Sequence, residues 1–271
     1  MIDARDLTLH IHGKPILENV SVQLHEGELT AIMGANGAGK TSLLSVLCGD
    51  QPATRGHVCY HDINIDDFSR KQLARTRAVM PQHSPMNFPF SAWEVVAMGR
   101  TPYAQASRRQ EHQQALQCMA MTDTENFAEQ AFPTLSGGEK QRVQLARVLN
   151  QLLSSESSHR YLFLDECTAS LDPAHQHAVF QLLSKLTKQN IAVITIVHDI
   201  NLASQYCDRI IMLKNGRIRY DLPTHRAITP EHLGDVFNLR TVNITHPEGD
   251  WKVVAAAADA VIRTHKDLRI L

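Results

Sequence analysis

The sequence predicts an α/β fold with a parallel sheet at its core, an antiparallel β layer and an inserted helical subdomain. Residues 161–164 and 191–197 are short apolar runs, and a helix starting at Asp172-Pro173 lies between them. Strand, helix and strand in this order are typical of a parallel sheet. Between about residues 85 and 155 the pattern becomes helical instead, which predicts the insertion.

The N-terminal stretch, residues 2–31, alternates apolar and polar positions in short runs separated by turns at 12–15 and 25–28. Such alternation predicts an antiparallel β layer with one buried face. A second stretch of this kind follows at 57–65, and a strand-turn-strand pattern spans 209–220. The asparagine-glycine pair in the turn at 214–217 is a strong hairpin signal.

A glycine-rich loop connects the apolar run Leu29–Met33 to a helical stretch at 42–47. It reads Gly34, Ala35, Asn36, Gly37, Ala38, Gly39, Lys40, Thr41 and then Ser42. This matches the phosphate-binding loop in its strand-loop-helix context. Its glycines let backbone N–H groups converge on a β-phosphate, Lys40 would reach the β- and γ-phosphates, and the Thr41 hydroxyl would ligate Mg²⁺. We therefore expect a P-loop NTPase core of the RecA-like type.

The insertion begins after a connector, 81–89, that contains three prolines. Ser91 and Glu94 then form a capping box, and helices are predicted at 108–121 and 136–153. We expect one domain, 1–271, in which 1–84 and 156–271 form the RecA-like core and β layer and 85–155 forms the helical subdomain.

Two carboxylates, Asp165 and Glu166, follow the apolar strand at 161–164. The carboxyl ends of parallel strands are where ligands bind in α/β folds. Asp165 would hold Mg²⁺, and Glu166 would polarise the attacking water as a general base. Paired acids after a strand are common, and the phosphate loop upstream makes this interpretation strong.

A second candidate anion site lies at Leu135–Gln141. Ser136 and Glu139 form a capping box, while Gly137 and Gly138 leave backbone N–H groups exposed in the first helical turn. The alternative is that the segment is an ordinary capped helix start that binds no anion. If the site is real, either it closes on the same nucleotide as the phosphate loop, or the chain dimerises and each copy completes the other's site.

Residues 135–141 resemble the signature sequence of ATP-binding cassette (ABC) ATPases, and further family motifs follow in the expected order over about residues 2–220. Gln82 resembles the glutamine between the subdomains, Asp172 the dimer-facing aspartate, and His198 the switch histidine. The resemblance implies ATP and Mg²⁺ as cofactors and a head-to-tail homodimer. It implies a catalytic set of Glu166, His198 and Gln82, and metal ligation by Thr41, Gln82 and Asp165. Nucleotide-binding residues would be 34–42, 136–139 and Asp172.

One cassette without a fused membrane segment is similar to the separate ATPase subunits of bacterial importers. The segment Phe88–Arg100 resembles the iron-siderophore, haem and vitamin B12 group, most closely the haem importers. This implies a peripheral protein on the cytoplasmic face of the inner membrane, with two transmembrane permease subunits and, indirectly, a periplasmic binding protein as partners. The same role for a siderophore or vitamin B12, or a stand-alone P-loop enzyme such as a kinase, is the alternative.

The composition limits other classes of function. A net charge of −1 over 271 residues gives no basic field, so we expect no nucleic-acid partner. The five cysteines are odd in number and form no C-x-x-C pair, which favours reduced thiols. One of them, Cys167, stands where the family usually has proline. The fifteen histidines include close pairs that lack the Cys, Asp or Glu companions needed to complete a ligand set, so we expect solvated or packed side chains and not a metal site.

Overall fold

The computed structural model describes residues 1–82, 86, 88–104 and 106–261, so part of the proline-rich connector lies outside the described residues. The chain forms two compact units. The first contains residues 1–2, 24–28 and 59–195, and the second contains residues 3–23, 29–58 and 196–271.

The first unit contains a parallel β-structure. Strands β6 (Arg77–Met80) and β7 (Arg160–Asp165) pair in parallel, and β8 (Ile191–Ile196) is the neighbour of β7 on its other side. Every residue of β8 is buried, and so is β7 after its first residue. Continuous apolar runs of this kind are typical of strands covered on both faces. This part also contains β5 (Ile63–Asn64), a 3-10 turn at Ile65–Asp67, α2 (Arg70–Thr76) and α6 (Pro173–Thr187).

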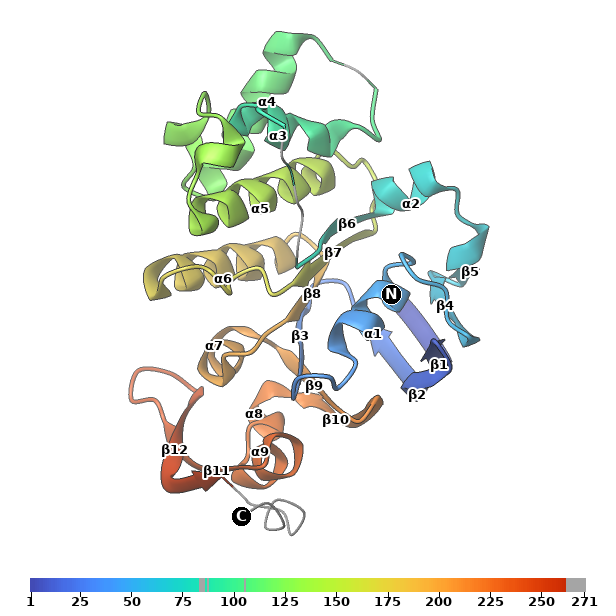
Figure 1. The fold of residues 1–271 in the computed structure, drawn as a ribbon, viewed down its shortest axis with the longest axis vertical. Coiled ribbons are helices and arrows are strands. Elements are labelled where there is room, and N and C mark those ends of the chain that lie inside the picture. The colour runs from blue at the N-terminus through green and yellow to red at the C-terminus, as the bar shows by residue number, and fades with distance from the viewer. Residues whose placement is uncertain (83–85, 87, 105, 262–271) are drawn as a thin grey trace. The chain divides into compact units, whose positions relative to one another are not determined.

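The helical insertion in the same unit is built from α3 (Ala92–Ala97), α4 (Arg108–Met121) and α5 (Gly137–Leu153), which pack against one another (Figure 1). Each helix starts at a serine that forms a capping box, namely Ser91, Ser107 and Ser136. Gly99 permits close packing on α5, because a Cβ there would lie 2.2 Å from the carbonyl oxygen of Arg147. Short 3-10 turns at Met98–Arg100, Glu125–Phe127 and Phe132–Thr134 connect the helices.

The second unit contains two groups of strands. Strands β2 (Lys14–Leu24), β1 (Ile2–Ile11) and β4 (Arg55–Tyr60) lie side by side in that order. Strand β3 (Leu29–Gly34) pairs in parallel with β9 (Arg209–Lys214), and β10 (Arg217–Pro223) pairs antiparallel with β9. Its helices are α1 (Lys40–Leu47), α7 (Ile200–Tyr206), α8 (Thr224–Ala227) and α9 (Pro230–Phe237).

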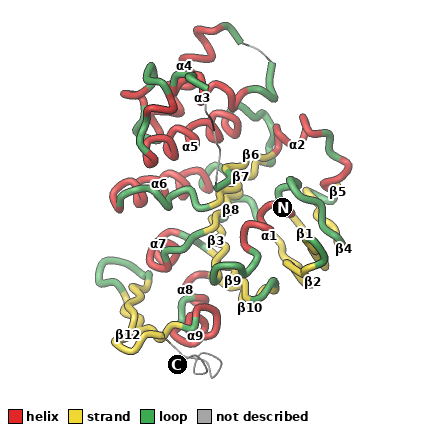
Figure 2. The backbone as a smooth tube through the Cα atoms, viewed as in Figure 1, coloured by secondary structure: helices red, strands yellow, loops and turns green. Residues whose placement is uncertain are grey.

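The structure confirms the predicted α/β fold class with parallel strands, an antiparallel β layer and inserted helices. The sequence analysis did not identify the C-terminal hairpin of β11 (Leu239–Thr245) and β12 (Lys252–Val261), which is clear in Figure 2. Of the helices in the described part of the chain, none has the length and apolar character needed to cross a bilayer.

Candidate functional site

The phosphate loop lies in the second unit, between β3 and α1. Gly34 has φ +152°, and a Cβ there would lie 2.4 Å from the carbonyl oxygen of Leu213. Gly39 has φ +100°, and its Cβ would lie 3.0 Å from the carbonyl oxygen of Ile16. Both positions therefore require glycine for the backbone angle and for the close neighbour. The loop shape is imposed by its glycines and by the strands that surround it.

Lys40 is the first residue of α1, and its side chain folds back over the loop. It is only 7% exposed, and Nζ donates hydrogen bonds to the carbonyl oxygens of Gly34 at 2.9 Å and Ala35 at 3.1 Å. The helix is preceded by a glycine, and its first turn contains no acidic residue. The positive end of the helix dipole and an ammonium group thus face the same loop, an arrangement that favours a bound anion.

The two acids lie in the first unit at the end of β7. Asp165 is the last residue of the strand and is 3% exposed. Glu166 follows it with φ +54°, a rare angle for a residue with a side chain. Its Oε2 accepts a hydrogen bond from Gln82 Nε2 at 2.9 Å. The structure therefore brings together Gln82 and Glu166, which the sequence placed in one catalytic set.

Gln141 of α5 is a contact that the sequence analysis did not identify. Its Nε2 donates to the backbone oxygen of Glu166 at 2.9 Å, and its Oε1 accepts from the N–H of Ser170 at 3.1 Å. The side-chain amide of Gln141 thus connects α5 to the backbone at the start and at the end of the loop that follows β7. An amide with both a donor and an acceptor is suited to this bridge.

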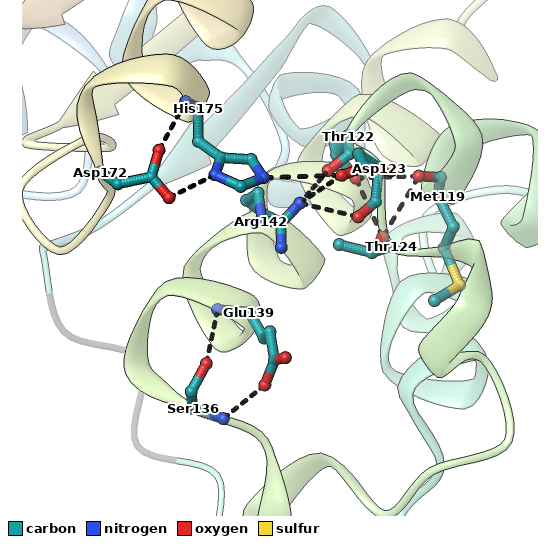
Figure 3. A network of polar contacts seen from close by, with 9 residues as sticks. All are labelled: Met119, Thr122, Asp123, Thr124, Ser136, Glu139, Arg142, Asp172 and His175. Carbon is teal, nitrogen blue, oxygen red and sulfur yellow. Dashed lines mark hydrogen bonds and ion pairs between the residues drawn. The ribbon is translucent and has the colours of Figure 1, made fainter.

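The start of α5 has the predicted capping box. Ser136 N–H donates to Glu139 Oε2 at 2.7 Å, and Glu139 N–H donates to Ser136 Oγ at 3.4 Å (Figure 3). The backbone hydrogen bond from Ser136 lowers the pKa of the Glu139 carboxyl, so this group is ionised at neutral pH. Gly138 packs closely, with its Cβ position 3.1 Å from the oxygen of Ser170, while nothing described lies within 4 Å of the Cβ position of Gly137.

Asp172 caps α6 and also takes part in a wider network (Figure 3). It accepts from the His175 N–H at 3.0 Å and lies 2.8 Å from His175 Nδ1. These contacts lower the pKa of the Asp172 carboxyl. On its other side, His175 Nε2 lies 3.5 Å from Asp123 Oδ2, which accepts from Arg142 Nη1 of α5 at 3.0 Å. His175 therefore connects the dimer-facing aspartate of the prediction to the helical insertion.

His198 and the phosphate loop belong to the second unit, whereas Gln82, the two acids, the signature residues and Asp172 belong to the first. His198 directly follows Val197 and is exposed. The structure thus shows the local geometry of two groups of predicted site residues, each inside its own unit.

A family profile described as ABC transporter matches residues 17–169. The chain belongs to the ABC transporter family. It is 40% identical over 259 residues to the Hemin import ATP-binding protein HmuV of Vibrio parahaemolyticus, covering 95% of this chain and 98% of that protein. The protein of the same name from Pseudomonas aeruginosa is 37% identical, covering 94% and 100%.

A solved ATP-binding cassette, a dimer in a post-hydrolysis state bound to ADP and Pi, has a similar fold. It is 28% identical, with a TM-score of 0.73, and covers 83% of this chain and 99% of that structure. The fold of this chain is therefore that of an ATP-binding cassette, as its family membership predicts.

Cys167, directly after Glu166, departs from the proline that the family resemblance led us to expect there. It is 2% exposed, and burial raises the pKa of its thiol to about 12. A neutral buried thiol acts as a small apolar group and is chemically inert. Cysteine in place of proline leaves both neighbouring acids, Asp165 and Glu166, in the sequence.

Proposed function

We propose that this chain is the ATP-hydrolysing subunit of a bacterial importer that moves haem across the inner membrane through a separate permease. The observation that carries the proposal is the 40% identity, over nearly the whole chain, to proteins named Hemin import ATP-binding protein. The protein would act from the cytoplasmic face as a peripheral subunit, with two permease subunits as its membrane partners and a periplasmic binding protein supplying the haem.

Residues 34–42 would bind the phosphates of ATP. The inward fold of Lys40 and the uncapped start of α1 support this role, because both direct positive charge at the loop. Thr41, Gln82 and Asp165 would ligate Mg²⁺. They offer a hydroxyl, an amide oxygen and a buried carboxylate, and Mg²⁺ prefers such oxygen ligands.

Glu166 would be the general base for water, with Gln82 and His198 completing the catalytic set. The hydrogen bond from Gln82 to Glu166 supports this assignment because it orients the carboxylate. General-base catalysis of this kind contributes about 10²–10⁴ in rate. His198 would act as the switch histidine of the family.

Ser136, Gly137, Gly138, Glu139 and Asp172 would contact the nucleotide bound to a second copy of the chain. The open space at the Gly137 Cβ position supports such access, because a phosphate could approach the first turn of α5 there. The functional unit would be a head-to-tail homodimer with two nucleotides between the copies.

The test is transport by the chain reconstituted with its permease in proteoliposomes. Haem, a ferric siderophore and vitamin B12 are offered separately with the cognate binding protein, and ATP-dependent uptake is measured. Uptake of haem alone supports the proposal, and uptake of another ligand reassigns the cargo. A chain that hydrolyses ATP at a rate proportional to its own concentration, without a dimer, would favour a stand-alone P-loop enzyme.

A further inference from the structure

Glu26, His61 and His159 form a side-chain cluster outside the nucleotide motifs. Glu26 lies in the turn after β2, His61 in the turn between β4 and β5, and His159 immediately before β7. All three belong to the first unit. Within the part of the chain that the structure describes, their Oε1, Nε2 and Nδ1 atoms lie within 4.8 Å of one another.

The Glu26 carboxylate is the centre of this cluster. Its Oε1 contacts His61 Nε2, lies 3.4 Å from His159 Nδ1 and accepts a hydrogen bond from the Tyr161 hydroxyl at 2.6 Å. Burial alone would raise the pKa of Glu26. The hydrogen bonds from the Met1 amino group, Tyr161 and His61 outweigh burial and lower it to about 2. Glu26 Oε1 is therefore the atom on which the polar groups of the cluster converge.

The two imidazole rings each place a nitrogen atom near the same carboxylate oxygen, Glu26 Oε1. They are stacked, with centroids 3.4 Å apart and planes inclined by 29°. His159 Nδ1 is buried and makes no hydrogen bond with any described residue. Both rings therefore direct a nitrogen atom at Glu26 Oε1, and His159 Nδ1 does so without a hydrogen bond to any described residue.

The cluster already accommodates a positive group. The Met1 amino group donates to Glu26 Oε1 at 2.6 Å and to the Tyr161 hydroxyl at 3.0 Å, and it lies 2.7 Å from His61 Nε2. This shows that the space between the carboxylate and the imidazole favours a cation. A metal ion bound there would exchange places with this ammonium group, and it needs no ligand from Met1.

We propose that Glu26, His61 and His159 bind one divalent transition-metal ion of the zinc type. Two imidazole nitrogens and a carboxylate oxygen are common zinc ligands, whereas Mg²⁺ prefers oxygen. In a tetrahedral site with bonds of about 2.0–2.2 Å, ligand atoms lie roughly 3.3 Å apart. The 3.4 Å between His159 Nδ1 and Glu26 Oε1 fits this spacing, whereas His61 Nε2 contacts Oε1 more closely and would move outward when the ion binds.

Tyr161 is an outer partner of the proposed site that contacts the ligand Glu26. Its hydroxyl donates a hydrogen bond to Glu26 Oε1 at 2.6 Å and so fixes the orientation of the carboxylate. Outer partners of this kind orient metal ligands. Because the ligands come from two turns and from the loop before β7, metal binding would connect these segments and stabilise the first unit.

The test is a titration of the untagged, chelator-treated chain with Zn²⁺ by calorimetry, without nucleotide. We expect one ion per chain and binding at least about tenfold weaker in His61→Ala, His159→Ala and Glu26→Gln, since each removes a ligand. His57→Ala is the matched control, because His57 is an exposed histidine on the same segment as His61 but outside the cluster. Its binding should equal that of the unaltered chain.

Thermal unfolding gives a second readout. Zn²⁺ should raise the unfolding midpoint of the unaltered chain and of His57→Ala, and leave that of His159→Gln unchanged. His159→Gln keeps a polar side chain, and its circular dichroism without metal shows whether the fold is intact. Failure of the unaltered chain to bind one Zn²⁺, or equal binding by a His61→Ala/His159→Ala double variant, would overturn the proposal.

Discussion

At the scale of single residues, Glu166 is held from two directions. Its side chain accepts from Gln82 and its backbone oxygen accepts from Gln141. Its φ of +54° costs free energy in a residue with a Cβ, and such costs persist where surrounding contacts enforce them. The carboxylate therefore has a defined orientation before any substrate arrives, as a general base requires.

Glu166→Gln should preserve ATP binding and lower turnover by about 10²–10⁴. The amide oxygen can still accept from Gln82, so the geometry survives while the basicity is lost. Steady-state ATPase rates and sizing chromatography with Mg-ATP measure the two effects, and the variant should accumulate as an ATP-bound dimer. Glu156→Gln, at an exposed loop position, is the control and should behave as the unaltered chain. A monomeric Glu166→Gln variant with normal turnover would contradict the base assignment.

Lys40→Ala should weaken ATP binding and hydrolysis together. A hydrogen bond to a charged group contributes about 1.5–3 kcal/mol, which corresponds to roughly 10- to 150-fold in the dissociation constant. Equilibrium titration with labelled ATP at physiological salt measures the change. Lys71→Ala removes an exposed lysine of α2 and should leave affinity unaltered. Equal ATP affinity of Lys40→Ala and the unaltered chain would exclude the phosphate-loop assignment.

At the scale of elements, a comparison of two helix N-termini distinguishes capping that stabilises a helix from capping that also serves nucleotide binding. Helices α4 and α5 lie in the same unit and start with the same capping box, Ser107 with Gln110 and Ser136 with Glu139. Only the box of α5 has two glycines between its members. The cap should contribute equally to the stability of both helices, whereas only the start of α5 should contact nucleotide.

Ser136→Ala and Ser107→Ala should therefore each lower the free energy of unfolding by about 1 kcal/mol, the usual cost of losing a serine cap. Only Ser136→Ala should also reduce ATP-dependent dimerisation and hydrolysis. Urea unfolding and ATPase assays at matched folded fractions measure the two effects. If both variants lose activity to the same degree, the capping box of α5 acts only through stability.

Local patterns account for the elements that the sequence predicted. The strands β3, β7 and β8 are continuous apolar runs, and the capping boxes at Ser91 and Ser136 are short-range signals. The hairpin of β11 and β12 was not predicted. The apolar residues Val242 and Ile244 of β11 are exposed, so the sequence of this strand does not show the alternation of a strand with one buried apolar face.

The residues of the candidate site are likewise of two kinds, those that the sequence predicted and those that only the structure shows. The phosphate loop and the signature segment are contiguous in sequence, so spacing identifies their residues. The bridge from Gln141 to Glu166 and Ser170 joins positions 25 and 29 residues apart. The cluster of Glu26, His61 and His159 comes from two turns and a loop that are far apart in the sequence, which is why histidine spacing predicted no metal site. Contacts made only by tertiary folding leave no periodic pattern to recognise.

At the scale of the whole molecule, the proposed importer needs a surface where the permease transmits movement. We place it at residues 81–93, of which 83–85 and 87 lie outside the described residues. Phe88 is 69% exposed and Phe90 39%, with ring centroids 6.1 Å apart. Phe90 is anchored to the insertion, because its carbonyl oxygen accepts from the Phe132 N–H at 2.8 Å. Exposed aromatic pairs on a rigid base are typical of partner interfaces.

Substitution of Met86, Phe88 or Phe90 by alanine should leave the ATPase activity of the free chain intact, since these side chains contribute little to the nucleotide motifs. Stimulation of ATPase activity by the permease, and haem uptake, should fall because truncating a buried anchor of an interface commonly costs more than about 1 kcal/mol. Reconstituted transport measured beside free ATPase activity tests this. Ile63→Ala, which truncates an apolar residue 51% exposed on β5, is the matched control and should alter neither activity. Parallel loss of free and stimulated activity would show that the aromatic pair maintains the fold, and full retention of both would place the permease contact on another surface.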